Sequence, residues 1–470
     1  MKKYARAFSL KFQLKIFSRV TIFMFLLMNI NGCKKDFKST IPNETTDDNS
    51  GPFSPALARQ PNIILIIGDD VGYEIPTYTG GQSYNTPNLD LMAQNGIQFT
   101  QAYCHPDGFP SRLAALSGKY NFRNYIKWGI LPPGGHTIAN MLHGAGYATC
   151  YVGKWQNDGG DEGIKAAGFD KYRVFLPFSY PSNQFKGRYK SPILYENGNY
   201  LPDSVTAGRY SEDMNVEYLS NFIHDNKKNP FFAIYSMPLI QKPWVPTPDD
   251  PEYASWNPTF DEQNQDVKYF PSMVNYMDKK IGDVMNALQQ NGVKNNTLVL
   301  FTTDNGTNVF IHSIYNGVNR KGNKNMTTLF GIRIPLVATW PAKIQQGQVT
   351  NTIVNFTDFL PTFADVAGIS KPTDYGALDG ISFYDNLRNK KGVDRSWSFC
   401  YWDNSATDNK PMVKYVNDTM YKLYYTPLLD SFFNTKKDVK EKMKLNLNQL
   451  TPQEQLIRNE FIQVFQAMHN

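Results

Sequence analysis

The sequence predicts a doubly wound α/β fold, in which helices flank a mostly parallel β-sheet and a smaller α+β subdomain follows at the C-terminal end. Two patterns support this class. Short, mostly β-branched runs recur along the chain, and their unbroken apolarity is typical of strands buried on both faces. Segments with apolar residues at helical spacing separate these runs, and strands that alternate with helices indicate a parallel sheet.

The expected strands are short and apolar throughout. The first of them consists of consecutive aliphatic residues, and a run of this length suits a strand better than a helix. The runs are 63–67, 147–152, 231–236, 298–301 and 334–339.

Two helices are expected between these strands. The first covers 211–225, with Ser211 as its N-cap, and the second covers 272–290, before Asn291-Gly292 ends the pattern. The methionines of the second helix allow two interpretations, a soft-metal site or part of the core. A methionine stripe at helical spacing far more often packs in a core, which we expect here.

The pattern changes after about Gly368, where aromatic and lysine-rich stretches replace the apolar runs. The segment 421–425 resembles an antiparallel strand, and 451–468 has the signature of a terminal helix, with a threonine cap and a proline at its first position. We therefore expect a large domain at 61–368 and a C-terminal subdomain at 369–470.

Composition places the chain among soluble globular enzymes, because 470 residues with 41% hydrophobic content can bury a large core. The formal net charge is +6, but six basic residues and no acid precede Cys33. Without those six, the 48 basic residues become 42, equal to the 42 acidic residues. The charge therefore gives no reason to expect a nucleic-acid partner.

The N-terminal segment predicts export. A basic stretch precedes the apolar run 20–28, which is too short to span a bilayer and is typical of a signal peptide. The sequence then reaches Gly32-Cys33, which resembles a bacterial lipobox. We expect a signal peptide at 1–32, a lipidated Cys33 with a flexible tether at 33–60, and an outer-membrane or periplasmic lipoprotein that touches the membrane only through this anchor. The alternative is an ordinary cleaved signal with an incidental cysteine.

Carboxylates follow two of the expected strands. Asp69 and Asp70 come after the first strand, and Asp304 and Asn305 come after the fourth. In an open α/β sheet such strand ends meet at one edge, where ligands bind. Three carboxylates and an amide oxygen form an all-oxygen shell that suits Ca²⁺ or Mg²⁺ rather than zinc. Each segment alone is also a common turn sequence.

Residues 109–118, which run from Phe-Pro-Ser-Arg to Ser-Gly, resemble the activation motif of the sulfatase family in the alkaline phosphatase superfamily. That motif is Cys-x-Pro-Ser-Arg, followed by a helix of small residues and a Ser/Thr-Gly step. Other matching segments are Asn85 to Asp90, Gly153 to Trp155 and Ile332 to Pro335, so the resemblance covers about 61–368. It implies an alkaline-phosphatase-like fold, hydrolysis of sulfuric esters, and a sulfated small molecule or glycan as ligand.

The resemblance also implies roles for single residues. The three aspartates and the asparagine named above match the family's calcium ligands. Arg112 matches the arginine that steadies the nucleophile, Lys154 the lysine that contacts nucleophile and sulfate, and Lys324 the lysine that holds the sulfate. Such fixed positive charges stabilise the charge that develops as a sulfuryl group transfers. Taken singly, either lysine is also typical of a solvated surface.

Three positions depart from the family pattern. Gly108 stands where a cysteine or serine becomes the formylglycine nucleophile, so no formylglycine is expected there. Gln156 replaces the histidine of Gly-Lys-Trp-His, and Gln241 replaces a histidine that protonates the leaving alcohol. Glutamine does not exchange a proton near neutral pH. Cys104 is interpreted as a buried packing residue rather than a displaced nucleophile, because catalysis tolerates only a sub-ångström displacement.

Three functions stay open from the sequence. In the first, the protein keeps its cation and sulfate-binding residues and turns sulfate esters over weakly or not at all. In the second, a metal-bound water attacks a sulfate or phosphate ester directly at Gly108. In the third, the protein is a non-catalytic sulfated-glycan-binding or scaffold lipoprotein. The first follows most directly from the loss of nucleophile and general acid together, and neither His105 nor His312 is expected to replace that acid.

Overall fold

The computed structural model describes most of the chain after residue 59. The described ranges are 60–124, 129–131, 136–178, 187–403, 412–426 and 429–468. The expected signal peptide, the lipidated Cys33 and all but the last residue of the expected tether lie outside these ranges. Within them, no helix is long and apolar enough to cross a membrane.

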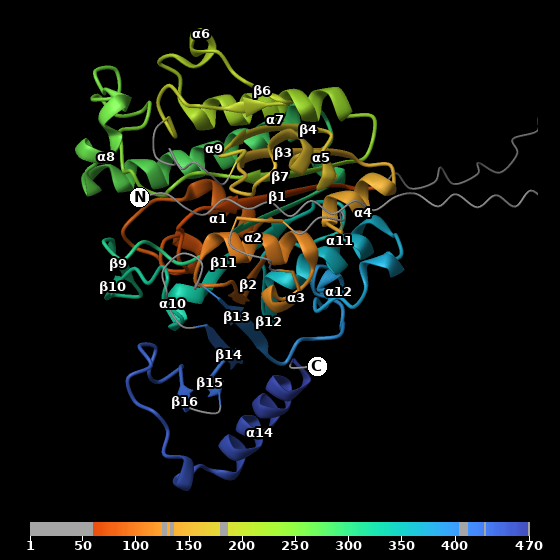
Figure 1. The fold of residues 1–470 in the computed structure, drawn as a ribbon, viewed down its shortest axis with the longest axis vertical. Helices are drawn as coiled ribbons and strands as arrows, with labels where there is room; N and C mark the ends of the chain where they lie inside the picture. Colours follow the sequence, from red (N-terminus) through yellow and green to blue (C-terminus); the bar gives the residue numbers. More distant parts are fainter. Residues whose placement is uncertain are drawn as a thin grey trace, which may run out of the picture. The chain divides into compact units, whose positions relative to one another are not determined.

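A ten-stranded mixed sheet forms the centre of the larger part of the fold (Figure 1). Its strands are β1 Asn62–Gly68, β2 Ile97–Tyr103, β3 Ala148–Lys154, β4 Lys171–Phe175, β5 Tyr195–Glu196, β6 Asn199–Tyr200, β7 Phe231–Ser236, β8 Thr297–Thr303, β11 Arg333–Thr339 and β12 Gln348–Asn355. Their order is β12-β2-β11-β8-β1-β7-β3-β4-β5-β6. The central strands β8, β1, β7, β3 and β4 are parallel neighbours, whereas β11 runs antiparallel to both β2 and β8.

The first strand shows why its sequence is apolar without interruption. Ile63, Leu65 and Ile67 belong to one hydrophobic cluster, and Ile64 and Ile66 belong to a second. Successive side chains of a strand point to opposite faces, so a strand that is covered on both faces needs apolar residues at every position. Each of these five side chains is at most 3% exposed.

Helices supply the other side of each cluster. Those that contribute residues to the cluster of Leu65 are α2 Gly108–Ser117, α4 Ile138–Gly144, α5 Gly160–Ala166, α11 Phe359–Ala367 and α12 Tyr384–Leu387. Those that contribute residues to the cluster of Ile64 are α1 Pro87–Gln94, α7 Ser211–Asn226 and α9 Phe270–Gln290. In α9 the side chains of Met273 and Met277 are fully buried, so these methionines are core residues as expected.

A second, antiparallel sheet follows in the C-terminal part of the chain, beside the last helix (Figure 1). Its elements are β13 Ser398–Trp402, β14 Val413–Asn417, β15 Tyr421–Thr426, β16 Leu429–Asn434 and α14 Pro452–Ala467. Thr451 caps α14 in a capping box with Glu454, as the sequence predicts for this threonine. Shorter elements are α3 Asn121–Asn124, α6 Asp203–Thr206, α8 Asp261–Asn264, β9 His312–Tyr315, β10 Val318–Lys321 and α10 Leu329–Ile332.

The predicted fold class is confirmed, and each of the five expected strands overlaps an observed one. Some details differ. Ser211 is the first residue of α7 rather than its N-cap, and no side chain caps this helix. Strands β2 and β12 were not predicted, because both are only partly buried and polar residues interrupt their apolar ones.

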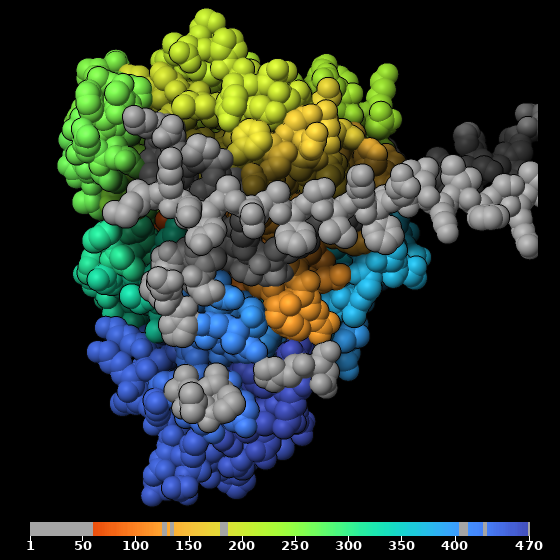
Figure 2. Space-filling view, viewed as in Figure 1, coloured from red at the N-terminus to blue at the C-terminus, as the bar shows by residue number. Residues whose placement is uncertain are grey.

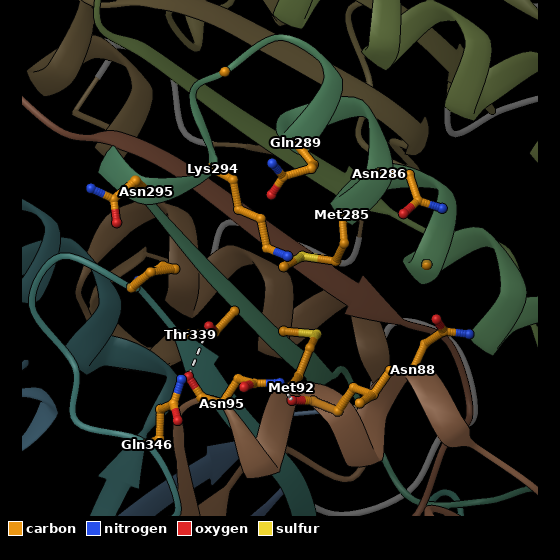
Figure 3. A pocket seen from close by; sticks show the side chains of 14 residues that line it. Asn88, Met92, Asn95, Met285, Asn286, Gln289, Lys294, Asn295, Thr339 and Gln346 are labelled. Carbon is orange, nitrogen blue, oxygen red and sulfur yellow. Dashed lines mark hydrogen bonds between the residues drawn. The ribbon is translucent and has the colours of Figure 1, made fainter.

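A cavity of about 470 Å³ lies at the amino-terminal edge of the parallel strands, between α1, α9 and the segment before β8 (Figure 3). Its lining is rich in carboxamides, and Lys294 also contributes to it. None of the described residues that line it is Asp, Glu, His or Cys, so its side chains offer no carboxylate for a cation and no group that exchanges a proton near pH 7. The chemistry belongs instead to the opposite edge, where β1 and β8 end.

Candidate metal and anion site

Two loops that leave neighbouring parallel strands carry the acidic residues of the site. Gly68 at the end of β1 pairs with Thr303 at the end of β8, so the residues after them leave the sheet side by side. Asp69, Asp70 and Asp304 are each at most 2% exposed. Asp70 has a φ of 64°, and this left-handed conformation turns the chain sharply after the strand.

The oxygens of these loops fit a divalent cation. One carboxylate oxygen from each of Asp69, Asp70 and Asp304 lies within 4.8 Å of the others. In the described part of the chain, Asp69 Oδ1, Asp70 Oδ2 and Asn305 Oδ1 are buried and accept no hydrogen bond. Buried acceptors without a partner are costly and rare, and a hard cation satisfies several of them at once. These four residues would hold the cation, which would add positive charge to the site.

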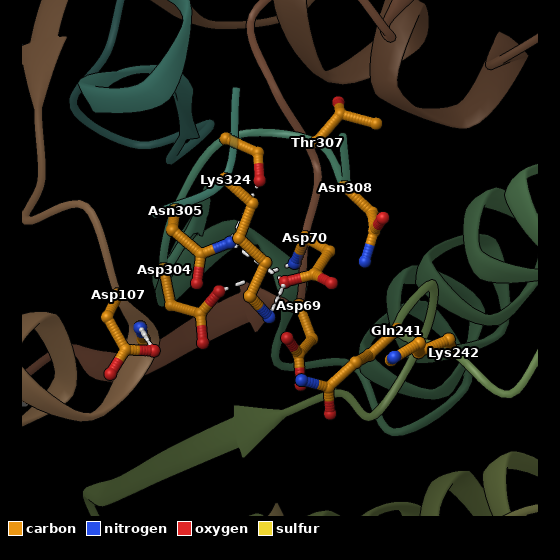
Figure 4. A network of polar contacts seen from close by, with 12 residues as sticks. Asp69, Asp70, Asp107, Gln241, Lys242, Asp304, Asn305, Thr307, Asn308 and Lys324 are labelled. Atoms are coloured by element: carbon orange, nitrogen blue, oxygen red, sulfur yellow. Dashed lines mark hydrogen bonds and ion pairs between the residues drawn. The ribbon is translucent and has the colours of Figure 1, made fainter. Parts of the chain in front are cut away.

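Three basic side chains enter the same cluster, one for each carboxylate. Figure 4 shows one of them, Lys324, beside Asp70. Lys154 Nζ, at the end of β3, lies 2.5 Å from Asp69 Oδ2. Lys324 forms an ion pair with Asp70, and Arg112 of α2 forms one with Asp304. When all three carboxylates are ionised, they and the three cations cancel in charge. A bound divalent cation would leave the cluster with an excess of two positive charges, which favours an anion beside it.

Burial dominates the protonation of these groups. It raises the pKa of Asp304 to about 7, an effect that the nearby Asp69 carboxylate strengthens and that Arg112 and Lys154 oppose. Burial lowers the pKa of the Lys154 ammonium, although Asp69 favours its charged form. For Lys324 burial also disfavours the charge, but Asp70 and its neighbours outweigh it and raise the pKa. Lys324 therefore stays a cation throughout the neutral range.

Gly108 is the first residue of α2, and its position is crowded. Its amide donates to Asp107 Oδ1 over 2.8 Å, so Asp107 caps the helix. A Cβ built on Gly108 would lie 2.8 Å from Arg112 Nη1 and would overlap Asp304 Oδ2. The absence of a side chain at this position thus allows the Arg112–Asp304 pair to close over the start of the helix.

Both glutamines of the predicted site join this network. Gln156 Oε1 accepts a hydrogen bond from Arg112 Nη2 over 2.5 Å, and Gln241 Oε1 accepts one from Lys154 Nζ over 3.0 Å. In each glutamine, the side-chain carbonyl oxygen accepts a hydrogen bond from a cationic side chain. The structure brings together all ten residues singled out in the sequence, from the ends of four strands, helix α2 and the loop after β10. Their catalytic and binding roles stay predictions.

The remaining candidates lie outside this network or support it. Cys104 is buried with its Sγ 3.3 Å from the Ile332 carbonyl oxygen, which fits a packing role. His105 is buried, and burial lowers its pKa to about 3, so its ring is neutral near pH 7 and lacks the imidazolium form that a general acid needs. His312 is exposed on β9, where its Nδ1 lies 3.3 Å from Asn319 Oδ1.

Two supporting residues were not found from the sequence. The Tyr189 hydroxyl donates to the Gln241 carbonyl oxygen over 2.5 Å and so holds the backbone of that glutamine. Thr307 Oγ1 accepts a hydrogen bond from the Gly72 amide over 2.9 Å and ties the two acidic loops together. Nothing in the local sequence of Tyr189 signals its role, whereas Thr307 follows Asp304-Asn305-Gly306 directly.

Comparison with known proteins agrees with this fold. The family model described as Sulfatase matches residues 61–369, and the model described as N-sulphoglucosamine sulphohydrolase, C-terminal, matches residues 323–467. Arylsulfatase A of Homo sapiens is 30% identical over 358 residues, which cover 69% of this chain and 67% of that protein. N-acetylgalactosamine-6-sulfatase of Homo sapiens is 28% identical over 379 residues, which cover 73% of this chain and 69% of that protein.

Solved structures share the fold. Ps i-CgsB in complex with k-i-k-neocarrahexaose superposes with a TM-score of 0.71 at 24% identity, covering 87% of this chain and 93% of that one. A protein solved with its substrate D-glucosamine-2-N,6-O-disulfate gives a TM-score of 0.70 at 20% identity, covering 87% and 97%. The fold and the acidic strand ends define an α/β protein of the alkaline-phosphatase-like class. The chain belongs to the sulfatase family, which confirms the resemblance found in its sequence.

Proposed function

We propose that this protein binds Ca²⁺ at Asp69, Asp70, Asp304 and Asn305, holds the sulfate group of a sulfated glycan beside it, and turns sulfate esters over weakly or not at all. The observation that carries the proposal is the intact set of carboxylate and cation pairs around a helix start that has no side chain. The side chains expected to bind the cation and the sulfate are present, whereas the side chain that would attack sulfur is absent.

The charge of the site supports sulfate as the bound group. A sulfate ester carries one negative charge and accepts hydrogen bonds on its oxygens, and buried ammonium and guanidinium groups are strong donors for such an anion. Lys324 and Lys154 supply the ammonium donors, and Arg112 supplies a planar fork. The divalent cation would neutralise the carboxylates, so the basic groups can turn their charge toward the ligand.

The two departures in this chain remove separate parts of ester hydrolysis. Gly108 has no atom that can attack sulfur, and Gln241 has no proton to give to a leaving alcohol near neutral pH. Binding and fixed charge alone leave only a small fraction of a hydrolase's rate enhancement. We therefore expect tight binding with little turnover.

A glycan is the proposed carrier of the sulfate. Among the structural relatives, one was solved with k-i-k-neocarrahexaose and another with its substrate D-glucosamine-2-N,6-O-disulfate, and both ligands are saccharides. We also propose the location expected from the sequence, an exported lipoprotein anchored at Cys33, since this suits a protein that meets glycans outside the cell.

Calorimetry tests the proposal. Sulfated oligosaccharides should bind in Ca²⁺ and lose their affinity when a chelator removes the metal. Lys324→Ala should weaken binding about tenfold or more, because hydrogen bonds to charged groups contribute about 1.5–3 kcal/mol each. Lys294→Ala is the matched control, since that lysine lies in the cavity at the other edge of the sheet. Absence of metal-dependent binding in the unaltered protein would sink the proposal.

The same samples decide whether a metal-bound water hydrolyses esters instead. Rates on aryl sulfates, phosphodiesters and phosphonate esters are compared between the unaltered protein and Asp304→Ala. Asp304 contributes an oxygen to the acidic cluster, so a metal-assisted reaction should depend on it. Equal background rates in both proteins would exclude that alternative.

A further inference from the structure

A hydrogen-bonded cluster joins the C-terminal sheet to the loop 322–328, which lies between β10 and α10. The cluster consists of Lys422 and Tyr424 of β15 together with Glu441. Lys422 Nζ donates to the Thr327 carbonyl oxygen and, over 3.1 Å, to Glu441 Oε1. The Tyr424 hydroxyl lies 2.7 Å from Thr327 Oγ1 and donates to Glu441 Oε2 over 2.5 Å. Both side chains of β15 therefore hold the same loop residue.

This cluster is buried and charged. The side chains of Lys422 and Glu441 are 1% and 5% exposed. The Lys422 ammonium also lies 4.1 Å from the ring centroid of Tyr415 and 4.9 Å from that of Tyr424, so aromatic faces and hydrogen bonds replace its water. A buried ion pair is costly to desolvate and needs well-placed partners, which fixes the geometry of the groups that it holds.

The other end of the loop is tied to the core of the large domain. The Lys324 amide donates to the Thr307 carbonyl oxygen over 2.8 Å, and the Asn325 amide donates to the Pro106 carbonyl oxygen over 2.9 Å. The loop is thus held on one side by segments next to the acidic strand end and to α2. On the other side it is held by the C-terminal sheet through Thr327. Figure 2 shows the teal residues of this region bordering the blue C-terminal residues.

Lys324 lies between these two attachments. Its ammonium forms an ion pair with Asp70, and its side chain is 14% exposed. The position of this ammonium in the site therefore depends on the position of the loop. Thr327 follows it by three positions, so a shift of the loop at Thr327 moves the backbone of Lys324 with it. A displacement of a charged donor by about 1 Å is enough to weaken an interaction that depends on fixed geometry.

We propose that Lys422, Tyr424 and Glu441 are positioning residues that hold the 322–328 loop so that Lys324 meets the bound anion. The C-terminal sheet then contributes to the anion site without touching the anion. This inference rests on the proposed function, because the proposed function makes Lys324 a sulfate ligand.

The decisive comparison is Tyr424→Phe against Tyr415→Phe. The first substitution removes the hydroxyl that contacts both Thr327 and Glu441. The second removes the hydroxyl of the cross-strand neighbour on β14, an aromatic residue of the same sheet whose hydroxyl is not among the contacts of Thr327 or Glu441. Both variants keep the ring and the charges.

Inorganic sulfate is the probe, titrated into the full chain by calorimetry in the presence of Ca²⁺. Tyr424→Phe should raise the dissociation constant for sulfate about 3- to 10-fold, the effect of one hydrogen bond. Its affinity for Ca²⁺ should not fall, because the cluster bonds to Thr327 rather than to the metal ligands, and a looser Lys324 competes less with the cation for Asp70. Tyr415→Phe should leave both affinities as they are.

A second variant and a second measurement remove the dependence on one substitution. Thr327→Val deletes the same contact from the loop side and should give the same loss of sulfate affinity. Amide hydrogen exchange without sulfate should be faster at 322–328 in Tyr424→Phe and in Thr327→Val, and unchanged there in Tyr415→Phe.

Two results would overturn the inference. One is unchanged sulfate affinity and loop exchange in both Tyr424→Phe and Thr327→Val. The other is an equal fall of Ca²⁺ and sulfate affinity, as general loss of structure would produce. Failure of the proposed function gives a different result, because the unaltered protein itself would then bind no sulfate. In that case amide hydrogen exchange at 322–328 alone would decide whether the cluster holds the loop.

Discussion

Gly108→Ala tests how the start of α2 and the acidic cluster depend on one another. The new methyl carbon would overlap Asp304 Oδ2 and would lie 2.8 Å from Arg112 Nη1. The backbone next to it is fixed as the first turn of a buried helix, so the Arg112–Asp304 pair must move. Separation of a buried ion pair costs about 3–5 kcal/mol, and alanine returns up to ~1 kcal/mol through its helix propensity. The net loss in chelator is therefore about 2–4 kcal/mol.

Thermal unfolding measures this loss with and without metal. With ~2.1 cal/mol/K of unfolding entropy per residue and about 400 folded residues, 1 kcal/mol corresponds to ~1.2 °C, so Tm in chelator should fall by about 2–5 °C. In excess Ca²⁺ the fall should shrink to about 1 °C or less, because the cation replaces Arg112 as the partner of Asp304.

Gly144→Ala is the matched control for this substitution. Gly144 ends helix α4, and a Cβ there would meet nothing within 4 Å. Its Tm should stay constant or rise slightly in both conditions. Equal losses for Gly108→Ala with and without Ca²⁺, or no loss in chelator, would refute the coupling between the helix start and the metal ligands.

Four further predictions follow from the site and its surroundings. Burial raises the pKa of Glu212 to about 7 from an ordinary 4.5, while Tyr235 and Asn215 lower it, so its contribution to stability is present below pH 4.5 and is lost as pH rises through 7. Glu212→Gln should remove about 3 kcal/mol of the pH dependence of the free energy of unfolding, measured by urea unfolding between pH 5 and 8. An unchanged dependence of that free energy on pH would contradict this prediction. Ca²⁺ at 100 times its dissociation constant should stabilise the protein by about 2.7 kcal/mol in thermal unfolding, and Asp70→Asn should abolish most of this gain. Gly108→Cys, coexpressed with the formylglycine-generating enzyme, should restore aryl sulfate turnover only partly, and added Gln241→His should raise the rate about 10²–10⁴-fold; no further rise argues against the missing acid. Cys33→Ala should abolish the incorporation of labelled palmitate into the cellular protein, and retained label would exclude lipidation at this cysteine.

Much of the fold was readable from local patterns. Continuous aliphatic runs such as 63–67 identified the central strands, because a strand covered on both faces has no polar side. The direction of β11 was not readable, since its apolar pattern is the same for a parallel and an antiparallel strand. The prediction of strands relied on unbroken apolar runs. It therefore missed β2 and β12, in which polar residues interrupt the apolar ones.

The candidate site was readable in its members but not in its connections. Asp69 and Lys154 are 85 positions apart, and Asp70 and Lys324 are 254 apart, so only the packed sheet brings each carboxylate to its cation. The contacts of Gln156 with Arg112 and of Gln241 with Lys154 likewise join different elements.

The sequence by itself determined the family, the fold class and the identity of the residues around Gly108. Short motifs identify the family and these residues, and the spacing of apolar residues identifies the fold class. Only the tertiary structure decided that a side chain at Gly108 would collide with Asp304, and that Lys422 and Tyr424 of a distant sheet hold the loop of Lys324. The physical reason is that motifs record local requirements, whereas ion pairs and steric overlap depend on distances that exist only after distant segments have packed together.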